Sequence, residues 1–464
     1  MTPASAALAD LWAQGGGDPA ALERITLTGA DPILPTGIKI GTAASALIAA
    51  SALAATELWR QRTGRGQSVA VDLRAAVAAF KSERFLRVNG ETPADVLGEL
   101  FGFYRTGDDR FIQLHCAMPH HQDGIVRFLG APPTREGLAA AVATWKAGEL
   151  EDALAGDGRP VGIVRSRAEW QAHPQGRAVA GLPLFEIVKI GDSRPEPAGT
   201  GARPLSGVRA LDLTRVLAGP VCGRTLASHG ADVMLVTSPH LYLAPAHVMD
   251  TALGKLSVSL DLRQPADTER LHGLVREADV FCQSYRPGTL AGRGLTPEGL
   301  ARLRPGIVYV TVSAFSHAGP WQARRGFETL IQSVSGMAEE QGRLAGGGPP
   351  RHLPAQVVDH GTGYLAALGA LLALGRRARE GGSYLVRVSL AQTGRWVDTL
   401  GRVDGTGTPD LGLPDVGDLL AEMDTPFGRL RHVVPAARLS ETPCGWSRPA
   451  VPLGTHAPVW PERL

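Results

Sequence analysis

The sequence has few features that would tie it to a metal, an oxidising compartment or a polyanion. Its four cysteines are scattered, without a CxxC pair, so neither a zinc site nor a disulfide framework is indicated and a reducing compartment fits. The formal net charge is only +2, and no block of like charge points to nucleic acid or an anionic membrane as a partner. The start, MTPASAALADLW, lacks the basic and apolar segments of a secretory signal. We therefore expect a cytoplasmic protein.

Long charge-free apolar runs are also scarce. The most apolar stretch, residues 42–59, is dominated by alanine and serine and runs directly into TELWRQR. This composition predicts a buried helix of a soluble protein rather than a membrane span. With 464 residues, 44% of them hydrophobic, the chain can bury large cores and should form two or more domains.

Several common catalytic motifs are missing. No GxSxG or HExxH occurs, which argues against serine hydrolase and zinc protease chemistry. LAGP stands at residues 217–220 in place of GxGxxG, and no GK[ST] follows Asp212, so neither a dinucleotide cofactor nor a Walker loop is favoured. In QLHCAMPHHQDG, His115, His120 and His121 lack the convergence of a metal site, and we expect them at a helix start or at the edge of a substrate.

One pattern is present twice. Residues 34–73 and 353–390 share a Leu-Pro pair, an Ala/Leu-rich helix, a basic Gly-rich turn and a strand. With the Leu-Pro pairs in register, Asp359 falls opposite Ile40, so only the second copy keeps its polar residues. We therefore expect the chemistry to lie in the second copy.

After residue 205, short apolar runs alternate with helical stretches. The runs GVRALDL, VMLV, LSVSLDL, DVFCQ and GIVYVTVSAF predict strands of a Rossmann-like open parallel sheet, in an α/β protein that also has a smaller α/β domain. PEPAGTGARP, at 195–204, is typical of a linker. The predicted segments are 1–198, with the degenerate first copy and a small domain; 205–398, with the Rossmann-like sheet; and a C-terminal tail, 399–464.

Two clusters could carry chemistry. Tyr285 and Arg286, in QSYRPG, follow a predicted strand, where a ring beside a guanidinium can hold a purine and a phosphate or simply form a capped turn. In RRGFETLIQ, Glu328 stands between a basic pair and an apolar helix. Such a carboxylate is often salt-bridged to arginine, but in an apolar setting it can also attack a thioester and form an acyl-enzyme anhydride.

These stretches together resemble the class III CoA-transferases, the family of formyl-CoA transferase, carnitine CoA-transferase and alpha-methylacyl-CoA racemase. The matching segments, between residues 207 and 390, are GVRALDLTRVLAGP, ASHGADVMLV, GKLSVSLDL, EADVFCQSYRPGTLAGRGL, RPGIVYVTVSAFSHAGPW, RRGFETLIQSVSG and VVDHGTGYLAALGALLAL. The resemblance implies the class III CoA-transferase fold with an internal repeat, in a rearranged or doubled form. It also implies a homodimer, interlocked as in the family, with a pseudo-dimer folded from one chain as the alternative.

The resemblance assigns roles to individual residues. Glu328 occupies the position of the family's nucleophilic aspartate, and Asp359 matches the second acid of the racemase branch. The residues expected to line the CoA site are Val216, Leu217, Ala218, Gly219, Lys255, Tyr285, Arg286 and Arg325. Lys255 and the arginines would meet phosphates. No metal and no organic cofactor is implied, because coenzyme A is itself a substrate.

At three positions the sequence differs from the family pattern, and each difference bears on the predicted activity. Glu328 is one methylene longer than aspartate, and a misplacement of about an ångström can cost on the order of a hundredfold in rate. Phe327 stands where the racemase branch has histidine, which disfavours two-base epimerisation. Leu217 replaces a glutamine of the formyl-CoA enzymes, which argues against formate or oxalate as the acid.

We predict a CoA-transferase that moves CoA between an acyl-CoA and a carboxylic acid through an enzyme anhydride and a glutamyl-CoA thioester. Backbone N–H groups near Gly336 or within residues 342–350 are expected to stabilise the oxyanions. One alternative is a catalytically weak acyl-CoA binding protein in which Glu328 is only salt-bridged. Another is an epimerase or lyase that uses Glu328 and Asp359 at the α-carbon of the acyl group.

Overall fold

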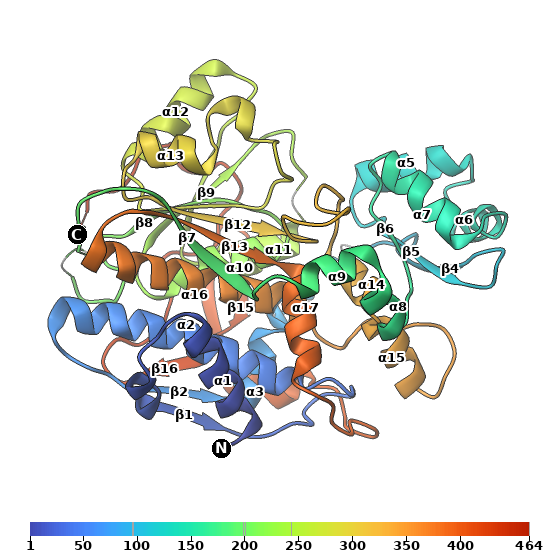
Figure 1. Cartoon of the computed structure of the whole chain (residues 1–464), viewed down its shortest axis with the longest axis horizontal. Coiled ribbons are helices and arrows are strands. Elements are labelled where there is room, and N and C mark those ends of the chain that lie inside the picture. The colour runs from blue at the N-terminus through green and yellow to red at the C-terminus, as the bar shows by residue number, and fades with distance from the viewer. Residues whose placement is uncertain (95–96, 198, 200, 243, 464) are drawn as a thin grey trace.

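The computed structural model describes the whole chain except residues 95–96, 198, 200, 243 and 464. Two of these fall in the predicted linker, 195–204, which therefore lies partly outside the described residues. A twisted sheet with helices on both faces occupies the centre, and a small domain projects to one side (Figure 1). The α/β prediction is thus confirmed.

The central sheet has seven strands in the order β10-β9-β8-β11-β12-β13-β7, and all its pairings are parallel except that of β13 with β7. The strands are β7 (Phe185–Gly191), β8 (Arg209–Leu213), β9 (Asp232–Thr237), β10 (Lys255–Ser259), β11 (Val280–Gln283), β12 (Val308–Ser313) and β13 (Ser383–Ser389). β8 and β11 are buried at every position, because helices cover both faces of the sheet. The chain winds outwards in opposite directions from these two strands, so their carboxyl ends form the switch point where ligands bind in such sheets.

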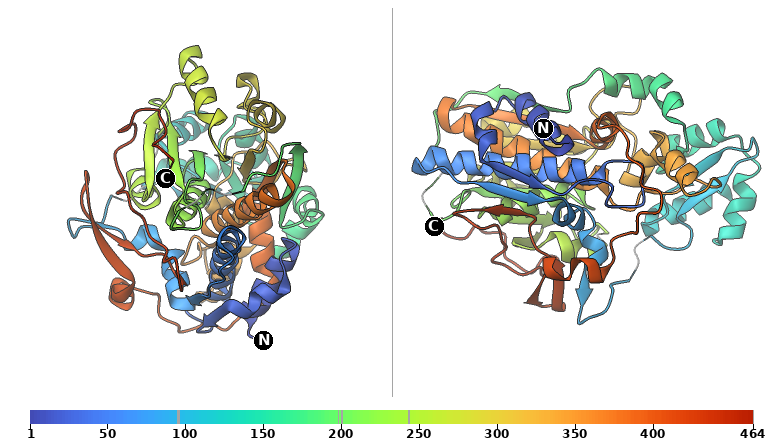
Figure 2. Two further views of the ribbon diagram at one scale, coloured as in Figure 1. Left: turned by 90° about the vertical axis from the view of Figure 1, so that its left-hand side faces the viewer. Right: turned by 90° about the horizontal axis from the view of Figure 1, so that it is seen from below.

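Different helices cover the two faces of this sheet. α12 (Pro265–Arg276) and α13 (Pro297–Leu303) lie on one face, above the sheet in Figure 1. α10 (Ala218–Ser228) and α16 (Val357–Glu380) lie on the other, followed by α2 (Ile40–Thr63), which packs side by side with α16 (Figure 2). The largest hydrophobic core lies around these last three helices.

The small domain has a hydrophobic core of its own. It consists of the antiparallel strands β4 (Gly102–Arg105), β5 (Phe111–Leu114) and β6 (Val161–Ile163) with α5 (Pro119–Leu129), α6 (Arg135–Val142) and α7 (Ala147–Gly156). Another antiparallel sheet is formed by β14 (Leu420–Thr425), β15 (Gly428–Val433) and β3 (Arg87–Val88). Further helices are α1 (Pro3–Gln14), α4 (Ser82–Phe85), α8 (Arg167–Ala172), α9 (Pro174–Ala180), α11 (Pro245–Thr251), α14 (Glu328–Val334) and α15 (Met337–Leu344), with the 3₁₀ turns η1 (Pro19–Arg24), η2 (Ala291–Arg293) and η3 (Leu413–Leu419).

The first half of the chain, before the predicted linker, and the second half, after it, each contribute a strand to a sheet of the other half. β2 (Val69–Asp72) pairs in parallel with β1 (Ile25–Thr28) and antiparallel with β16 (Ala437–Leu439). β13 likewise has a parallel neighbour, β12, and an antiparallel one, β7. β7 comes from the first half and β16 from the C-terminal tail, so each half completes the other's sheet. Two sheets therefore cross the predicted divisions at 198–205 and 398–399.

The repeated segments form matching elements. α2 and α16 each have 24 residues and end at a glycine with positive φ, Gly64 and Gly381. Both lead into a strand and then a helix, α3 (Leu73–Ala79) in the first copy and α17 (Leu390–Thr399) in the second. Matching the helix starts places Asp359 opposite Thr42. The Leu-Pro register, with Asp359 opposite Ile40, was wrong, because the loop between Leu-Pro and the helix is longer in the first copy.

α2 and α16 are long and apolar enough to cross a membrane by composition alone, but their most apolar windows are 94% buried inside the protein. The prediction of a buried helix at residues 42–59 is therefore confirmed.

Candidate active site

A cleft of about 530 Å³ lies at the carboxyl ends of β8, β11 and β12. Its walls are the turns after these strands and, from the first half of the chain, the start of α5. Proline at the first position of α5 suits a helix start and places His120 and His121 in the first turn, as expected from the sequence. The predicted CoA-site residues that line this cleft are Val216, Ala218, Gly219, Tyr285, Arg286 and Arg325.

The turn after β8 has an unusual backbone. Val216 has a φ of 71°, which a β-branched residue rarely adopts. Strain of this kind costs on the order of 1–3 kcal/mol and is concentrated at ligand sites. Gly219 lets α10 approach the turn, since a Cβ there would lie 2.3 Å from the Thr214 side chain. Leu217 lines a smaller cavity next to the cleft.

Three guanidinium groups, those of Arg215, Arg286 and Arg325, converge on the cleft without a carboxylate partner among the described residues. Arg215 lies over the ring of Tyr285, 5.7 Å from its centre. Burial lowers the pKa of Arg325, and the charges of Arg286 and Arg215 lower it further. This uncompensated positive charge suits a polyanionic ligand. Arg215 is not among the residues predicted from the sequence, although it directly precedes Val216.

The structure does not bring Lys255 to the cleft. Its side chain is 1% exposed, and its ammonium group forms an ion pair with Asp212 at 2.7 Å and donates to the Pro220 carbonyl oxygen at 2.8 Å. This pairing connects β10 to β8 and α10.

We therefore expect Lys255→Met to act on stability. The change leaves Asp212 buried without its partner, which should lower the free energy of unfolding by about 3–5 kcal/mol. Urea unfolding measures this loss, and CoA titration of the folded protein should give an unchanged Kd. Weaker CoA binding with unchanged stability would instead restore the phosphate role predicted for Lys255.

Glu328 begins α14 and is 3% exposed. Its Oε1 accepts hydrogen bonds from Gln332 Nε2 at 2.6 Å and from the N–H of Val358 at 3.2 Å, while Oε2 accepts from the N–H of Asp359. Val358 and Asp359 are the second and third residues of α16. The carboxylate therefore lies on the free N–H groups at the positive end of a long helix.

Asp359 lines both the cleft and the smaller cavity, and no described residue hydrogen-bonds to its carboxylate. Burial raises the pKa of Glu328 to about 8, and the charge of Asp359 adds to the shift. Burial and then the charge of Glu83 raise the pKa of Asp359 to about 7. Both shifts favour the protonated forms of the two carboxyl groups.

The smaller cavity, of about 50 Å³, borders Glu328 and receives His115 from the first half of the chain. The His115 ring stacks on Phe327, with 3.8 Å between centres and 12° between planes. Burial lowers the pKa of His115 to about 3, so the imidazole is neutral. His121 accepts a hydrogen bond from Arg325 at 3.4 Å, and the described residues contain no group of three or more His, Cys, Asp or Glu arranged to hold a metal.

A second carboxylate makes the same helix contact in the first copy. Asp31 accepts from the N–H groups of Gly41 at 3.0 Å and Thr42 at 2.7 Å, the second and third residues of α2. This equivalence supports the register of Asp359 with Thr42. It also means that a contact with the amino terminus of a helix does not by itself distinguish Glu328 from Asp31. What distinguishes it is the cavity beside it and the second acid.

The backbone N–H groups that were expected to stabilise oxyanions lie away from the two acids. Neither Gly336 nor residues 342–350 line the cleft or the smaller cavity, and Gly336 instead lies close to the backbone of Arg167. The N–H groups at the acid are those of Val358 and Asp359. A helix terminus thus occupies the place that a glycine-rich loop was predicted to take.

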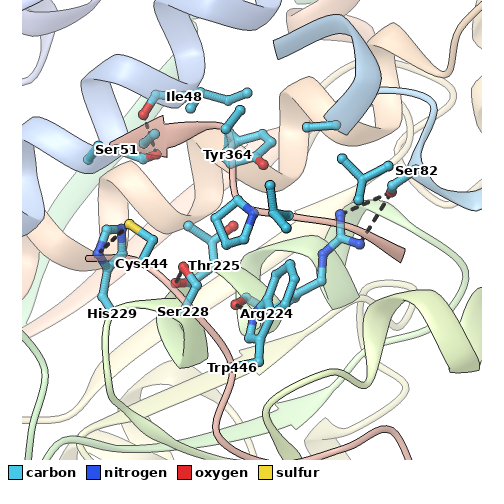
Figure 3. A pocket seen from close by; sticks show the side chains of 17 residues that line it. Ile48, Ser51, Ser82, Arg224, Thr225, Ser228, His229, Tyr364, Cys444 and Trp446 are labelled. Carbon is cyan, nitrogen blue, oxygen red and sulfur yellow. Dashed lines mark hydrogen bonds between the residues drawn. The ribbon is translucent and has the colours of Figure 1, made fainter. Parts of the chain in front are cut away.

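A different small cavity lies where α2, α10 and α16 meet the C-terminal tail (Figure 3). At about 30 Å³ it holds only a water or two. The Arg224 guanidinium is paired with Asp250 at 2.8 Å and donates to the Ser82 hydroxyl. Burial raises the pKa of Cys444 to about 12 and lowers that of His229 to about 3, so this neighbouring pair stays neutral and unreactive.

The fold and this site define an α/β protein with a cationic cleft that ends at two buried acids. The family model described as CoA-transferase family III matches residues 21–183 and 205–400, and the chain belongs to this family. The match in two segments is consistent with the doubled form predicted from the sequence.

Among similar proteins, an acetyl-coenzyme A transferase, nodX, of Hypoxylon pulicicidum is 31% identical over 333 residues, covering 66% of this chain and 56% of that protein. The succinyl-CoA–D-citramalate CoA-transferase of Chloroflexus aurantiacus is 34% identical over 200 residues, covering 40% of this chain and 49% of that protein. A solved structure of Rv3272 from Mycobacterium tuberculosis is 30% identical and covers 43% of this chain and 59% of that one, with a TM-score of 0.39. The chain thus spans about half the length of these relatives.

Proposed function

We propose that this chain transfers CoA from an acyl-CoA to a carboxylic acid, with Glu328 as the nucleophile. The observation that carries the proposal is the placement of the Glu328 carboxylate on the amino terminus of α16, beside a cavity that shares its lining with the cationic cleft. The arginines Arg215, Arg286 and Arg325 would bind the CoA phosphates, and Tyr285 would stack on the adenine. Lys255 has a structural role in this account.

The first half-reaction forms the enzyme thioester. Ionised Glu328 attacks the thioester carbonyl, the C–S bond breaks, and CoA thiolate leaves a mixed anhydride on the enzyme. The thiolate then attacks the glutamyl carbonyl and releases the donor acid as its carboxylate. The N–H groups of Val358 and Asp359 would stabilise the oxyanion on that carbonyl.

The second half-reaction reverses this order with the acceptor. Its carboxylate attacks the glutamyl-CoA thioester and gives a second anhydride, and the thiolate takes the acceptor's acyl group and frees Glu328. No step needs a metal, an organic cofactor or a net proton transfer.

The raised pKa of Glu328 predicts a pH dependence. The nucleophile must be ionised, so kcat/KM should rise with pH as Glu328 loses its proton near pH 8. The Asp359 charge helps to raise this pKa, so Asp359→Asn should move the rise to lower pH. Initial rates with acyl-CoA well below its KM, measured across this pH range for both proteins, give kcat/KM and test both expectations. A flat profile, or a shift to higher pH in the variant, would contradict the assignment.

Trapping separates this proposal from the two alternatives. After incubation with an acyl-CoA, hydroxylamine should convert Glu328 to a hydroxamate, which peptide mass spectrometry can locate. A protein that only binds acyl-CoA would stay unmodified, and the equivalent contact of Asp31 is the observation that favours this second candidate. Exchange of the α-proton in deuterated water without an acceptor acid would favour an epimerase or lyase.

We also propose that one chain is sufficient for a complete site. The cleft is lined by Met118, His120 and His121 from the first half and by Asp359 and the arginines of the second half. The pseudo-dimer is thus preferred over the predicted homodimer. Light scattering at assay concentration should give about the chain mass of 48.8 kDa, with a specific activity that does not fall on dilution. Activity confined to a dimer would contradict this.

A further inference from the structure

The cavity beside Glu328 is small and has distinct apolar and polar walls. Its volume of about 50 Å³ corresponds to a few water molecules, which suits a short chain. Its apolar side includes Ala117, Met118 and Leu217, and its polar side includes His115 and the two acids. A short acid with one further polar group would match these walls better than an extended alkyl chain.

His115 is a polar group of this cavity whose side chain has no partner among the described residues. The residue is 6% exposed, and neither of its ring nitrogens has a hydrogen-bond partner among the described residues. Nδ1 is completely enclosed by protein, which leaves Nε2 as the nitrogen that can meet a ligand. Because Nε2 has no hydrogen-bond partner among the described residues, it remains available to a ligand in the cavity.

The ring of His115 is held firmly in place. It stacks on Phe327, and its edge meets Phe101 at 5.3 Å and 87°. The backbone N–H of His115 donates to the Pro160 carbonyl oxygen at 3.1 Å. Because Phe327 is bonded directly to Glu328, the distance from Nε2 to the nucleophile is fixed by packing. A ligand bound to both groups would be selected by the position of its polar substituent.

The neutral imidazole also selects a chemical type. Depending on the tautomer, Nε2 either donates one hydrogen bond or accepts one. A hydroxyl group can do both, so it suits either tautomer, whereas a carboxylate can only accept and a methyl group can do neither. The hydroxyl group is therefore the substituent that this nitrogen fits best.

We propose that His115, from the first half of the chain, determines acid specificity by binding the hydroxyl group of a short hydroxy acid whose carboxyl group reaches Glu328. The inference rests on the proposed CoA transfer, and it assigns to that site a substrate class. In this account the small domain of the first half supplies the residue that selects the substrate.

The test compares two matched pairs of acceptor acids, lactate with propionate and 3-hydroxybutyrate with butyrate. The wild-type protein should prefer at least one hydroxy acid over its unsubstituted partner by about 10- to 100-fold in kcat/KM, since an unpaired buried polar group is costly. His115→Phe keeps a stacking ring of similar size and should remove the preference while retaining transfer to the unsubstituted acid. His115→Gln keeps a polar group and should retain part of the preference.

The control is His120→Phe, because His120 lines the cleft but not the small cavity. The preference of this variant for hydroxy acids should stay at the wild-type level. Equal rates for both members of each pair in the wild type, or a preference that survives in His115→Phe, would overturn the inference. Binding of the free acids, measured by NMR titration, separates it from the proposed function. Binding of the hydroxy acid that depends on His115, without turnover, would sustain the inference and refute CoA transfer. If neither binding that depends on His115 nor turnover is observed, the inference and the proposed CoA transfer are both refuted.

Discussion

Glu328→Gln is expected to lower kcat for CoA transfer by on the order of a thousandfold or more, because an amide oxygen is a poor nucleophile and the enzyme anhydride cannot form. CoA affinity should change little, since the arginines that face the phosphates lie elsewhere in the cleft. Glutamine still offers one oxygen to the N–H groups of α16, so the fold should persist. Steady-state rates and CoA titration on the same preparation measure the two effects.

Glu328→Asp tests whether the length of the side chain matters as well as its charge. The family carries aspartate at this position, but here the longer side chain reaches Val358 and Asp359 at the start of α16. Shortening it withdraws the carboxylate from these groups by about an ångström, which should cost on the order of a hundredfold in kcat. Full activity in Glu328→Asp would show that the glutamate is not fitted to this helix terminus. Full activity in Glu328→Gln would remove the proposed nucleophile altogether.

Arg215→Met is expected to raise the KM for acyl-CoA by about 10- to 100-fold, because a hydrogen bond to a charged group contributes about 1.5–3 kcal/mol. Arg215 has no carboxylate partner among the described residues, so its loss breaks no ion pair and stability should be nearly unchanged. The CoA affinity of the wild type should also fall steeply with salt, and less steeply in the variant. Isothermal titration at two salt concentrations measures both effects.

The matched control is Arg379→Met. Arg379 lies near the carboxyl end of α16, whereas the acids lie at its amino end, about 30 Å away along the helix. This variant removes the same charge from the protein and should leave the KM and its salt dependence at wild-type values. Equal effects in the two variants would mean that net charge, rather than a specific phosphate contact, governs binding.

The parts of the fold that have a local signature could be predicted from the sequence. β8 and β11 are short apolar runs buried on both faces, and the turns after them hold Val216, Tyr285 and Arg286 as expected. Long-range pairings have no such signature. The antiparallel additions of β7 to β13 and of β16 to β2 depend on which sheet edge is free once the halves meet.

The candidate site likewise has features that could be predicted from the sequence and others that depend on long-range packing. The family position and an apolar helix sufficed to single out Glu328, but not its contact with α16, which starts far along the chain. The family resemblance assigned Lys255 to the CoA phosphates, but Lys255 is buried in an ion pair with Asp212, which lies two strands away in the sheet. His115 reaches the site only because the small domain of the first half packs there.

The most direct test of the central claim follows oxygen atoms. An acceptor acid labelled with ¹⁸O in its carboxylate forms an anhydride through one labelled oxygen, and attack of thiolate on the acceptor carbonyl leaves that oxygen on the enzyme carboxylate. After a single turnover with acyl-CoA, mass spectrometry of the peptide that contains Glu328 should show one ¹⁸O, and after many turnovers it should show two. An unlabelled Glu328 peptide from an enzyme that has turned over, or label on Asp359 instead, would contradict the account.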